Sequence, residues 1–93
     1  MVAMLKRHGA RVTFVLPADV GPVSVVGDFN GWDPLAHPMR RRSNGTRSVA
    51  LELVPGPHSF RYLREGGEFF DDPEADAVEP NGYGEVHSVL VVA

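Results

Sequence analysis

Residues 46–70 read TRSVALELVPGPHSFRYLREGGEFF, a stretch that holds three short strand-like segments separated by two turns. Apolar and polar side chains alternate between residues 46 and 53. This two-residue period is typical of a half-buried strand, because successive strand side chains point to opposite faces. The alternation predicts that Val49, Leu51 and Leu53 face the core.

The second segment, His58–Glu65, lies between two turn signals. The sequence PGP at 55–57 predicts a rigid turn before it. The pair GG at 66–67 predicts a two-residue hairpin that leads into a short third strand over residues 68–70. The same alternation places Phe60 and Tyr62 inward.

The rest of the chain repeats this pattern of short β-prone runs between turns. It contains 10 glycines and 8 prolines, and no window of 12 residues shows a clean 3.6-residue period. The further predicted strands are Arg11–Leu16, Val23–Phe29 and Glu85–Val92. Gly27 inside a predicted strand indicates a bulge or a close backbone approach. Together these features predict an all-β sandwich with little or no helix.

The length of 93 residues predicts one domain. We expect residues 1–10 to be an N-terminal extension and residues 11–93 to form the sandwich. Two stretches, Asn30–Gly45 and Asp71–Gly84, are predicted to be long loops. The second is rich in Pro and Asp, and loops of that length are often functional.

The net charge of -3 hides a strong asymmetry. Residues 1–64 carry 9 basic and 4 acidic side chains, a net of +5, whereas residues 65–93 carry 8 acidic ones and no Lys or Arg. Arg40, Arg41, Arg42 and Arg47 form either a phosphate-binding patch or an ordinary solvated surface, and the second is favoured. An acidic pI near 5.7 argues against a nucleic-acid partner.

The composition also bears on compartment. The absence of cysteine excludes disulfides, thiolate catalysis and Cys-ligated zinc. No apolar run approaches the roughly 20 residues that span a bilayer, so no membrane partner is predicted. In the first ten residues the charges follow the apolar start, the reverse of a signal peptide. We therefore expect a cytoplasmic protein.

The sequence predicts no catalytic residue, no metal site and no cofactor. The four histidines lack metal-ligand spacing, and neither a G-x-S-x-G motif nor a glycine-rich phosphate loop is present. The acidic loop lacks an apolar pocket that would shift a carboxyl pKa, so we expect solvated anions rather than an acid/base pair. Its carboxylates are Asp71, Asp72, Glu74, Asp76 and Glu79.

Three aromatic residues are candidates for a surface function. Trp32 follows the turn dipeptide Asn30-Gly31, and Tyr83 lies between two glycines. The third is either Phe69 or Phe70, because adjacent residues of one strand point to opposite faces, so that one ring can enter the core while the other is more exposed. An exposed ring can stack on the apolar face of a sugar, whereas the alternative is that Trp32 is simply half-buried under the long loop.

Several sequence motifs, in order, match one known family. The sequence GDFNGWDP at 27–34 resembles the G-x-F-N-x-W signature of the glycogen-binding early-set domains, carbohydrate-binding module family 48. This family includes the glycogen-binding domain of the AMP-activated kinase β subunit. It also includes the N-terminal modules of isoamylases, pullulanases and glycogen-branching enzymes. PGPHSFRY at 55–62 is similar to its G-x-H/Y-x-Y-K-F strand, and FFDDP at 69–73 to its W-x-x-D-P segment. NGYGEVHSVL at 81–90 is similar to its N-x-x-G-x-x-N-x-V-x ending.

The resemblance covers about residues 11–93 and implies an immunoglobulin-like sandwich of about six to eight short antiparallel strands. Domains of this family bind α-1,4-linked glucans without hydrolysing them. The resemblance implies that Trp32 and Phe69 are the two stacking rings, with Phe69 in place of a tryptophan. Arg61 stands where a lysine hydrogen-bonds sugar hydroxyls.

Three further contacts are implied near the C-terminus. Tyr83 occupies the loop position of a leucine that, in the kinase subunit, probes the glucan coil. Glu85 stands in place of a threonine, and His87 in place of an asparagine that contacts a glucose. A neutral histidine keeps one donor and one acceptor there.

Two functions follow. The first is a non-catalytic α-glucan-binding module whose ligand is glycogen, starch or a maltooligosaccharide. The second is a structural or protein-interaction domain that is associated with a glucan-acting enzyme or a kinase complex and has no sugar affinity of its own.

Overall fold

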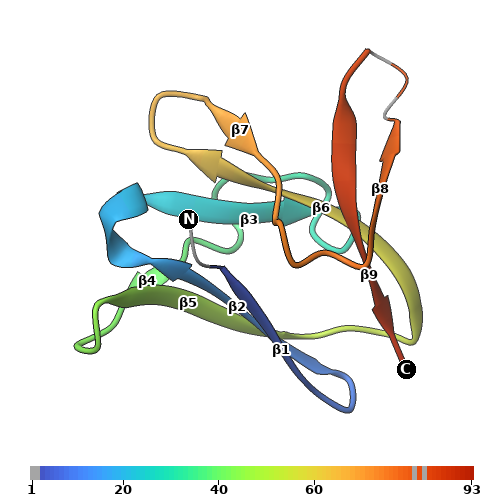
Figure 1. The fold of residues 1–93 in the computed structure, drawn as a ribbon, viewed down its shortest axis with the longest axis horizontal. Helices are drawn as coiled ribbons and strands as arrows, with labels where there is room; N and C mark the ends of the chain where they lie inside the picture. The colour runs from blue at the N-terminus through green and yellow to red at the C-terminus, as the bar shows by residue number, and fades with distance from the viewer. Residues whose placement is uncertain (1–2, 81, 83) are drawn as a thin grey trace.

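The computed structural model describes residues 3–80, 82 and 84–93, and within them nine strands form two antiparallel sheets (Figure 1). The first sheet has, in spatial order, β1 (Met4–His8), β2 (Arg11–Pro17), β5 (Thr46–Glu52) and β4 (Arg40–Arg41). The second has the order β3 (Val23–Gly27), β6 (Gly56–Arg64), β9 (Val86–Val92) and β8 (Ala77–Pro80), with β7 (Phe69–Phe70) also paired to β6. The predicted all-β sandwich is confirmed.

The core lies between the two sheets. Phe14 of β2 meets Phe60 and Tyr62 of β6 edge to face, with ring centroids 5.3 and 6.5 Å apart, and all three rings are fully buried. The inward assignments of Phe60 and Tyr62 are therefore confirmed. Leu53 is also buried, and Val49 and Leu51 pack against the core while only partly buried.

Helix is almost absent from the described residues, as the aperiodic sequence predicts. Between β2 and β3 the chain forms one 3-10 turn, Ala18–Val20. Among the described residues, no helix is long and apolar enough to cross a membrane.

The structure adds strands where the sequence predicted none. Met4–His8, inside the expected N-terminal extension, pairs with β2, so the sheet begins before residue 11. Arg40–Arg41 pairs with β5 inside the first expected loop, and Ala77–Pro80 pairs with β9 inside the second. Each addition is an edge strand, and its sequence lacks the apolar alternation that marks strands with a buried face. They raise the strand number above the expected six to eight.

Gly27 ends β3 where two backbones come unusually close. A Cβ atom at this position would lie 2.5 Å from the carbonyl oxygen of Ser59 and 2.6 Å from the Phe29 ring. The predicted close approach at Gly27 is therefore confirmed. It brings the end of β3 against β6 just before the chain turns toward Trp32.

The edge of β6 that faces away from β3 is shared by two strands. Phe60 pairs with Gly27 on one side and with Ser88 of β9 on the other. Two residues further on, Tyr62 pairs with Val25 on the first side and with Phe70 of β7 on the second. Strands β9 and β7 therefore succeed one another along β6. The β8–β9 hairpin projects beyond the two layers (Figure 1).

Candidate functional site

The loop after β3 holds Trp32 at the surface through its own hydrogen bonds. The Asn30 side chain accepts from the Gly27 amide (3.0 Å) and donates to the Val25 carbonyl (3.0 Å). The same Nδ2 group lies 2.9 Å from Nδ1 of His37, so that nitrogen is the acceptor. The Trp32 amide donates to the Gly27 carbonyl at 2.9 Å, and Trp32 has a φ of 59°. This left-handed conformation is uncommon for a non-glycine residue and ends the turn.

The ring that this turn presents is 41% exposed. Trp32 is thus near the surface, as its position after a turn dipeptide predicted. Its ring centroid lies 6.2 Å from that of His87, at an interplanar angle of 49°. The loop after β3 and strand β9, which are far apart in sequence, therefore meet at these two rings.

The outer face of the second sheet contributes Arg61 and Phe69. Because Phe60 and Tyr62 point into the core, Arg61 between them points outward. Phe69 is 46% exposed, and the Arg61 guanidinium carbon lies 5.1 Å from its ring centroid. That distance is within the range of a cation–π contact. Phe70 turns inward and packs 5.2 Å from the Tyr62 ring, so the predicted opposite orientation of the two phenylalanines is confirmed.

His87 lies on the same outer face. The register that pairs Ser88 with Phe60 makes His87 and Arg61 the next residues on the outer side of neighbouring strands. On its other flank, His87 is paired with Glu79 of β8, and Nε2 is 3.8 Å from a Glu79 carboxylate oxygen. That Nε2 is buried and makes no hydrogen bond to any part of the chain that the structure describes.

We call Trp32, Arg61, Phe69 and His87 the aromatic platform. Arg61, the basic residue of the platform, is mostly buried, with 12% of its side chain exposed. Asp71 lies 3.4 Å and Glu85 3.9 Å from its terminal nitrogens. Its Nε is buried and also lacks a hydrogen-bond partner within residues 3–80, 82 and 84–93.

Five of the six sequence-predicted site residues are thus brought together. Trp32 and His87 form one pair, Arg61 and Phe69 a second, and Glu85 flanks Arg61 with 65% of its side chain exposed. The sixth, Tyr83, lies outside the described residues.

Two carboxylates beside the platform were missed as members of the site. Asp71 contacts Arg61, and Glu79 faces His87. Only strand pairing identifies Glu79, since β8 was expected to be loop. The sequence shows two adjacent aspartates, Asp71 and Asp72, before Pro73. It does not indicate which of the two contacts Arg61.

Asp72 corrects the expectation that all carboxylates of the acidic loop are solvated. Asp72 is only 3% exposed, and its carboxylate accepts a 2.6 Å hydrogen bond from the Tyr62 hydroxyl. Burial, together with the adjacent Asp72 carboxylate, raises the pKa of Tyr62 far above its usual range. The pair is a structural link between β6 and the segment after β7.

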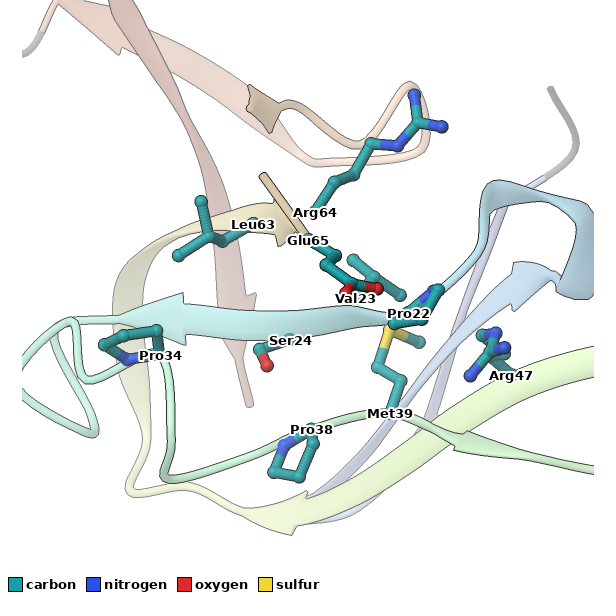
Figure 2. A pocket seen from close by; sticks show the side chains of 10 residues that line it. All are labelled: Pro22, Val23, Ser24, Pro34, Pro38, Met39, Arg47, Leu63, Arg64 and Glu65. Carbon is teal, nitrogen blue, oxygen red and sulfur yellow. The ribbon is translucent and has the colours of Figure 1, made fainter. Parts of the chain in front are cut away.

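A hollow elsewhere in the molecule contains none of the predicted site residues (Figure 2). It has a volume of about 260 Å³ and lies beside the start of β3, with Pro22, Met39 and Arg47 among its lining residues. Within the described residues, no group of three or more His, Cys, Asp or Glu side chains is arranged to hold a metal ion. The five described site residues form an outward-facing surface on the second sheet and the loop after β3.

Comparison with known proteins finds no matching family model. It does find similarity to segments of larger proteins. The chain is 57% identical over 69 residues to a 1,4-alpha-glucan branching enzyme of Pseudomonas aeruginosa, covering 69% of this chain and 9% of the enzyme. It is 50% identical over 40 residues to 1,4-alpha-glucan branching enzyme GlgB 2 of Xanthomonas campestris, covering 43% of this chain and 6% of the enzyme.

A third relative is the chloroplastic Protein PTST homolog 2 of Arabidopsis thaliana. It is 30% identical over 71 residues, which is 76% of this chain and 13% of that protein. The chain therefore spans only about 6% to 13% of the length of these three relatives.

Proposed function

We propose that this chain is a non-catalytic module that binds α-1,4-glucans such as glycogen, starch or maltooligosaccharides. The observation that supports this most is the aromatic platform, where the partly exposed Trp32 and Phe69 rings lie beside His87 and Arg61. The similarity to 1,4-alpha-glucan branching enzymes supports the ligand class. The small share of those enzymes that the chain matches is consistent with a module rather than a catalytic domain.

In this proposal the rings and the polar groups have separate tasks. Trp32 and Phe69 stack on the apolar faces of glucose units, and burying their exposed area contributes a few kcal/mol at about 25 cal/mol per Å². Arg61, Glu85 and His87 hydrogen-bond hydroxyls, each contributing roughly 1 kcal/mol. Tyr83 remains a predicted contact. The sum corresponds to a dissociation constant between about 1 mM and tens of μM.

Such weak binding is effective on a polymer. Many equivalent sites along one glucan raise the local ligand concentration, so a module of this affinity keeps an attached protein near its substrate. The predicted cytoplasmic location is compatible with glycogen as the ligand.

Titration with maltoheptaose or β-cyclodextrin tests the proposal directly. Trp32 is the only tryptophan in the chain, so a change in tryptophan emission reports on the platform alone. We expect a saturable change at sub-millimolar to millimolar sugar. Trp32→Ala should abolish binding measured by calorimetry while circular dichroism and the melting temperature stay close to wild type, because the ring is partly exposed.

Val54→Ala is the matched control. Val54 is 71% exposed and lies on the turn between β5 and β6, near Phe29 and His58 rather than the platform. The Val54→Ala protein should bind maltoheptaose as wild type does. Unchanged Trp32 emission at several millimolar sugar, together with no calorimetric signal, would contradict the proposal.

A second candidate function is a protein-interaction domain without sugar affinity. The apolar side chains exposed on the β8–β9 hairpin favour it, namely Val78 (60%), Val86 (43%) and Val91 (49%). Under this alternative the platform would not respond to glucan. Charged substitutions at these valines would instead disrupt association with a glucan-acting enzyme.

A further inference from the structure

Asp71 is the residue through which the core and the aromatic platform are connected. Its carboxylate is shared between two partners on different strands. Oδ1 accepts a 2.9 Å hydrogen bond from the Ser88 hydroxyl of β9, and Oδ2 lies 3.4 Å from an Arg61 terminal nitrogen on β6. Asp71 follows β7 directly, at the place where β9 and β7 succeed one another along the same edge of β6.

The side of Asp71 that faces the core is fixed. Ser88 is fully buried, and its Oγ accepts a 3.0 Å hydrogen bond from the Asp72 amide. A hydroxyl has a single proton, and the Ser88 proton is donated to Asp71. Asp72 is held in turn by the Tyr62 hydroxyl. A chain of hydrogen bonds therefore runs from the buried Tyr62 to the first oxygen of Asp71.

The second carboxylate oxygen of Asp71, Oδ2, faces the platform and accepts from Arg61. An arginine side chain has many rotamers, so the direction of its guanidinium depends on the groups around it. Here those groups are the Phe69 ring at 5.1 Å, Glu85 at 3.9 Å and Asp71 at 3.4 Å. Glu85 is 65% exposed whereas Asp71 is 24% exposed, so Asp71 is the better anchored of the two carboxylates.

We propose that Asp71 is a positioning residue for glucan binding, because it holds the Arg61 guanidinium against Phe69 in the orientation that receives sugar hydroxyls. This inference rests on the proposed function for its ligand. Asp71 acts through Arg61 and does not contact the sugar.

The test is a double-mutant cycle between Asp71 and Arg61. Asp71→Asn has the same shape, and its amide oxygen still accepts from Ser88. The amide nitrogen, however, faces the Arg61 donors and cannot accept from them. We expect Asp71→Asn to weaken maltoheptaose binding about three- to tenfold, the size of coupling within one hydrogen-bond network. In an Arg61→Gln background the same change should have no further effect.

Asp76→Asn is the matched control. Asp76 belongs to the same acidic segment, but its carboxylate binds Arg7, at 2.8 Å, instead of the platform. It should leave sugar affinity unchanged. A loss of affinity for Asp71→Asn that is equally large in the Arg61→Gln background would overturn the proposal, because it would indicate a direct sugar contact or a loss of fold.

A second measurement needs no sugar. In the free protein, NMR of the Arg61 side-chain Nε–H and of guanidinium rotation should show a restricted group in wild type and a freely rotating one in Asp71→Asn. Identical spectra would refute the positioning role. If wild type binds no glucan, the proposed function fails, and these spectra still decide whether Asp71 fixes Arg61.

Discussion

At the scale of single residues, hydrogen bonding distinguishes the polar groups of the core from those of the outer face. Asp72 and Tyr62 are buried and hydrogen-bonded to each other at 2.6 Å, so neither is accessible to a ligand. On the outer face, the Nε atom of Arg61 and the Nε2 atom of His87 are buried and have no hydrogen-bond partner within the described chain. Buried polar atoms without partners are costly, so these two atoms of the platform are not explained by packing alone.

The Tyr62–Asp72 pair gives a prediction about stability. Tyr62→Phe removes the donor and leaves a buried carboxylate oxygen without it, so the free energy of unfolding should fall by about 1–3 kcal/mol. Urea denaturation at pH 7 measures this. Adding Asp72→Asn should cost less in the Tyr62→Phe protein than in wild type, because the two groups interact directly.

The pH dependence of the same pair has a defined sign. The folded state raises the Tyr62 pKa, so the stabilisation is complete below the ordinary tyrosine pKa of 10.0 and is lost as the pH rises above it. Wild type should therefore lose stability above pH 10 more steeply than Tyr62→Phe. Parallel alkaline profiles for the two proteins would argue against this assignment.

At the scale of elements, the platform depends on how closely β3 and β6 approach. The Gly27 carbonyl accepts from the Trp32 amide, and the Gly27 amide donates to Asn30, so the Trp32 turn is built on the last residue of β3. That residue can approach β6 only without a Cβ atom. The sequence around Trp32 fixes the turn locally, while the position of the turn over β9 depends on strand pairing.

Gly27→Ala should therefore affect both stability and binding. The added Cβ would meet the Ser59 carbonyl at 2.5 Å, which is backbone that cannot move without shifting β6. We expect a loss of about 1–3 kcal/mol in the free energy of unfolding, a typical cost of overpacking. We also expect weaker glucan binding, because Trp32 moves relative to His87.

Ser24→Ala on the same strand is the control. Ser24 points to the outer face beside Leu63 and is only partly buried, so its loss should change stability little. Thermal denaturation and sugar titration of the two variants would be compared. A Gly27→Ala protein as stable as Ser24→Ala would contradict the close-approach argument.

At the scale of the whole molecule, the basic N-terminal part and the acidic C-terminal part of the sequence meet in an ion pair between the two sheets. Arg7 of β1, in the first sheet, binds Asp76, just before β8 of the second sheet, at 2.8 Å. The Arg7 hydrogen bond, with help from the Val91 amide, holds the pKa of Asp76 below its ordinary value. The basic N-terminal part and the acidic C-terminal part are thus joined at the edge of the sandwich.

The Arg7–Asp76 pair should contribute a small, pH-dependent stability. A depressed folded-state pKa stabilises the protein above the unfolded-state pKa, and the effect disappears as the pH falls through the folded-state value. Asp76→Asn should reduce the free energy of unfolding at pH 7 by less than about 1 kcal/mol, since both side chains are partly exposed. The difference from wild type should shrink as the pH falls below the ordinary Asp pKa of 3.8 and through the lower folded-state value.

Glu74→Gln provides the comparison, because the Glu74 side chain forms no ion pair with any described residue. Its denaturation profile against pH should follow wild type. An Asp76→Asn deficit that stays undiminished as the pH falls well below 3.8 would assign the effect to packing rather than charge.

How far the sequence predicts this molecule depends on where its side chains point. Strands with an apolar face, such as β2 and β6, follow from two-residue alternation, since one face must leave water. Edge strands β1, β4 and β8 do not, because exposed strands lack that alternation and depend on backbone pairing with a neighbour. For the same reason the sequence did not predict where Glu79 lies, because its place opposite His87 depends on the strand register.

Taken alone, the amino-acid sequence determined the fold class, the position of Trp32 directly after a turn, and the opposite orientations of Phe69 and Phe70. These properties depend on local geometry and on the burial of apolar side chains. Three contacts follow from the folded arrangement and not from the sequence: Trp32 meets His87, Arg61 lies over Phe69, and Asp72 is buried while Asp71 reaches the platform. The physical reason is that strand order and register bring together residues whose separation along the chain carries no record of the contact.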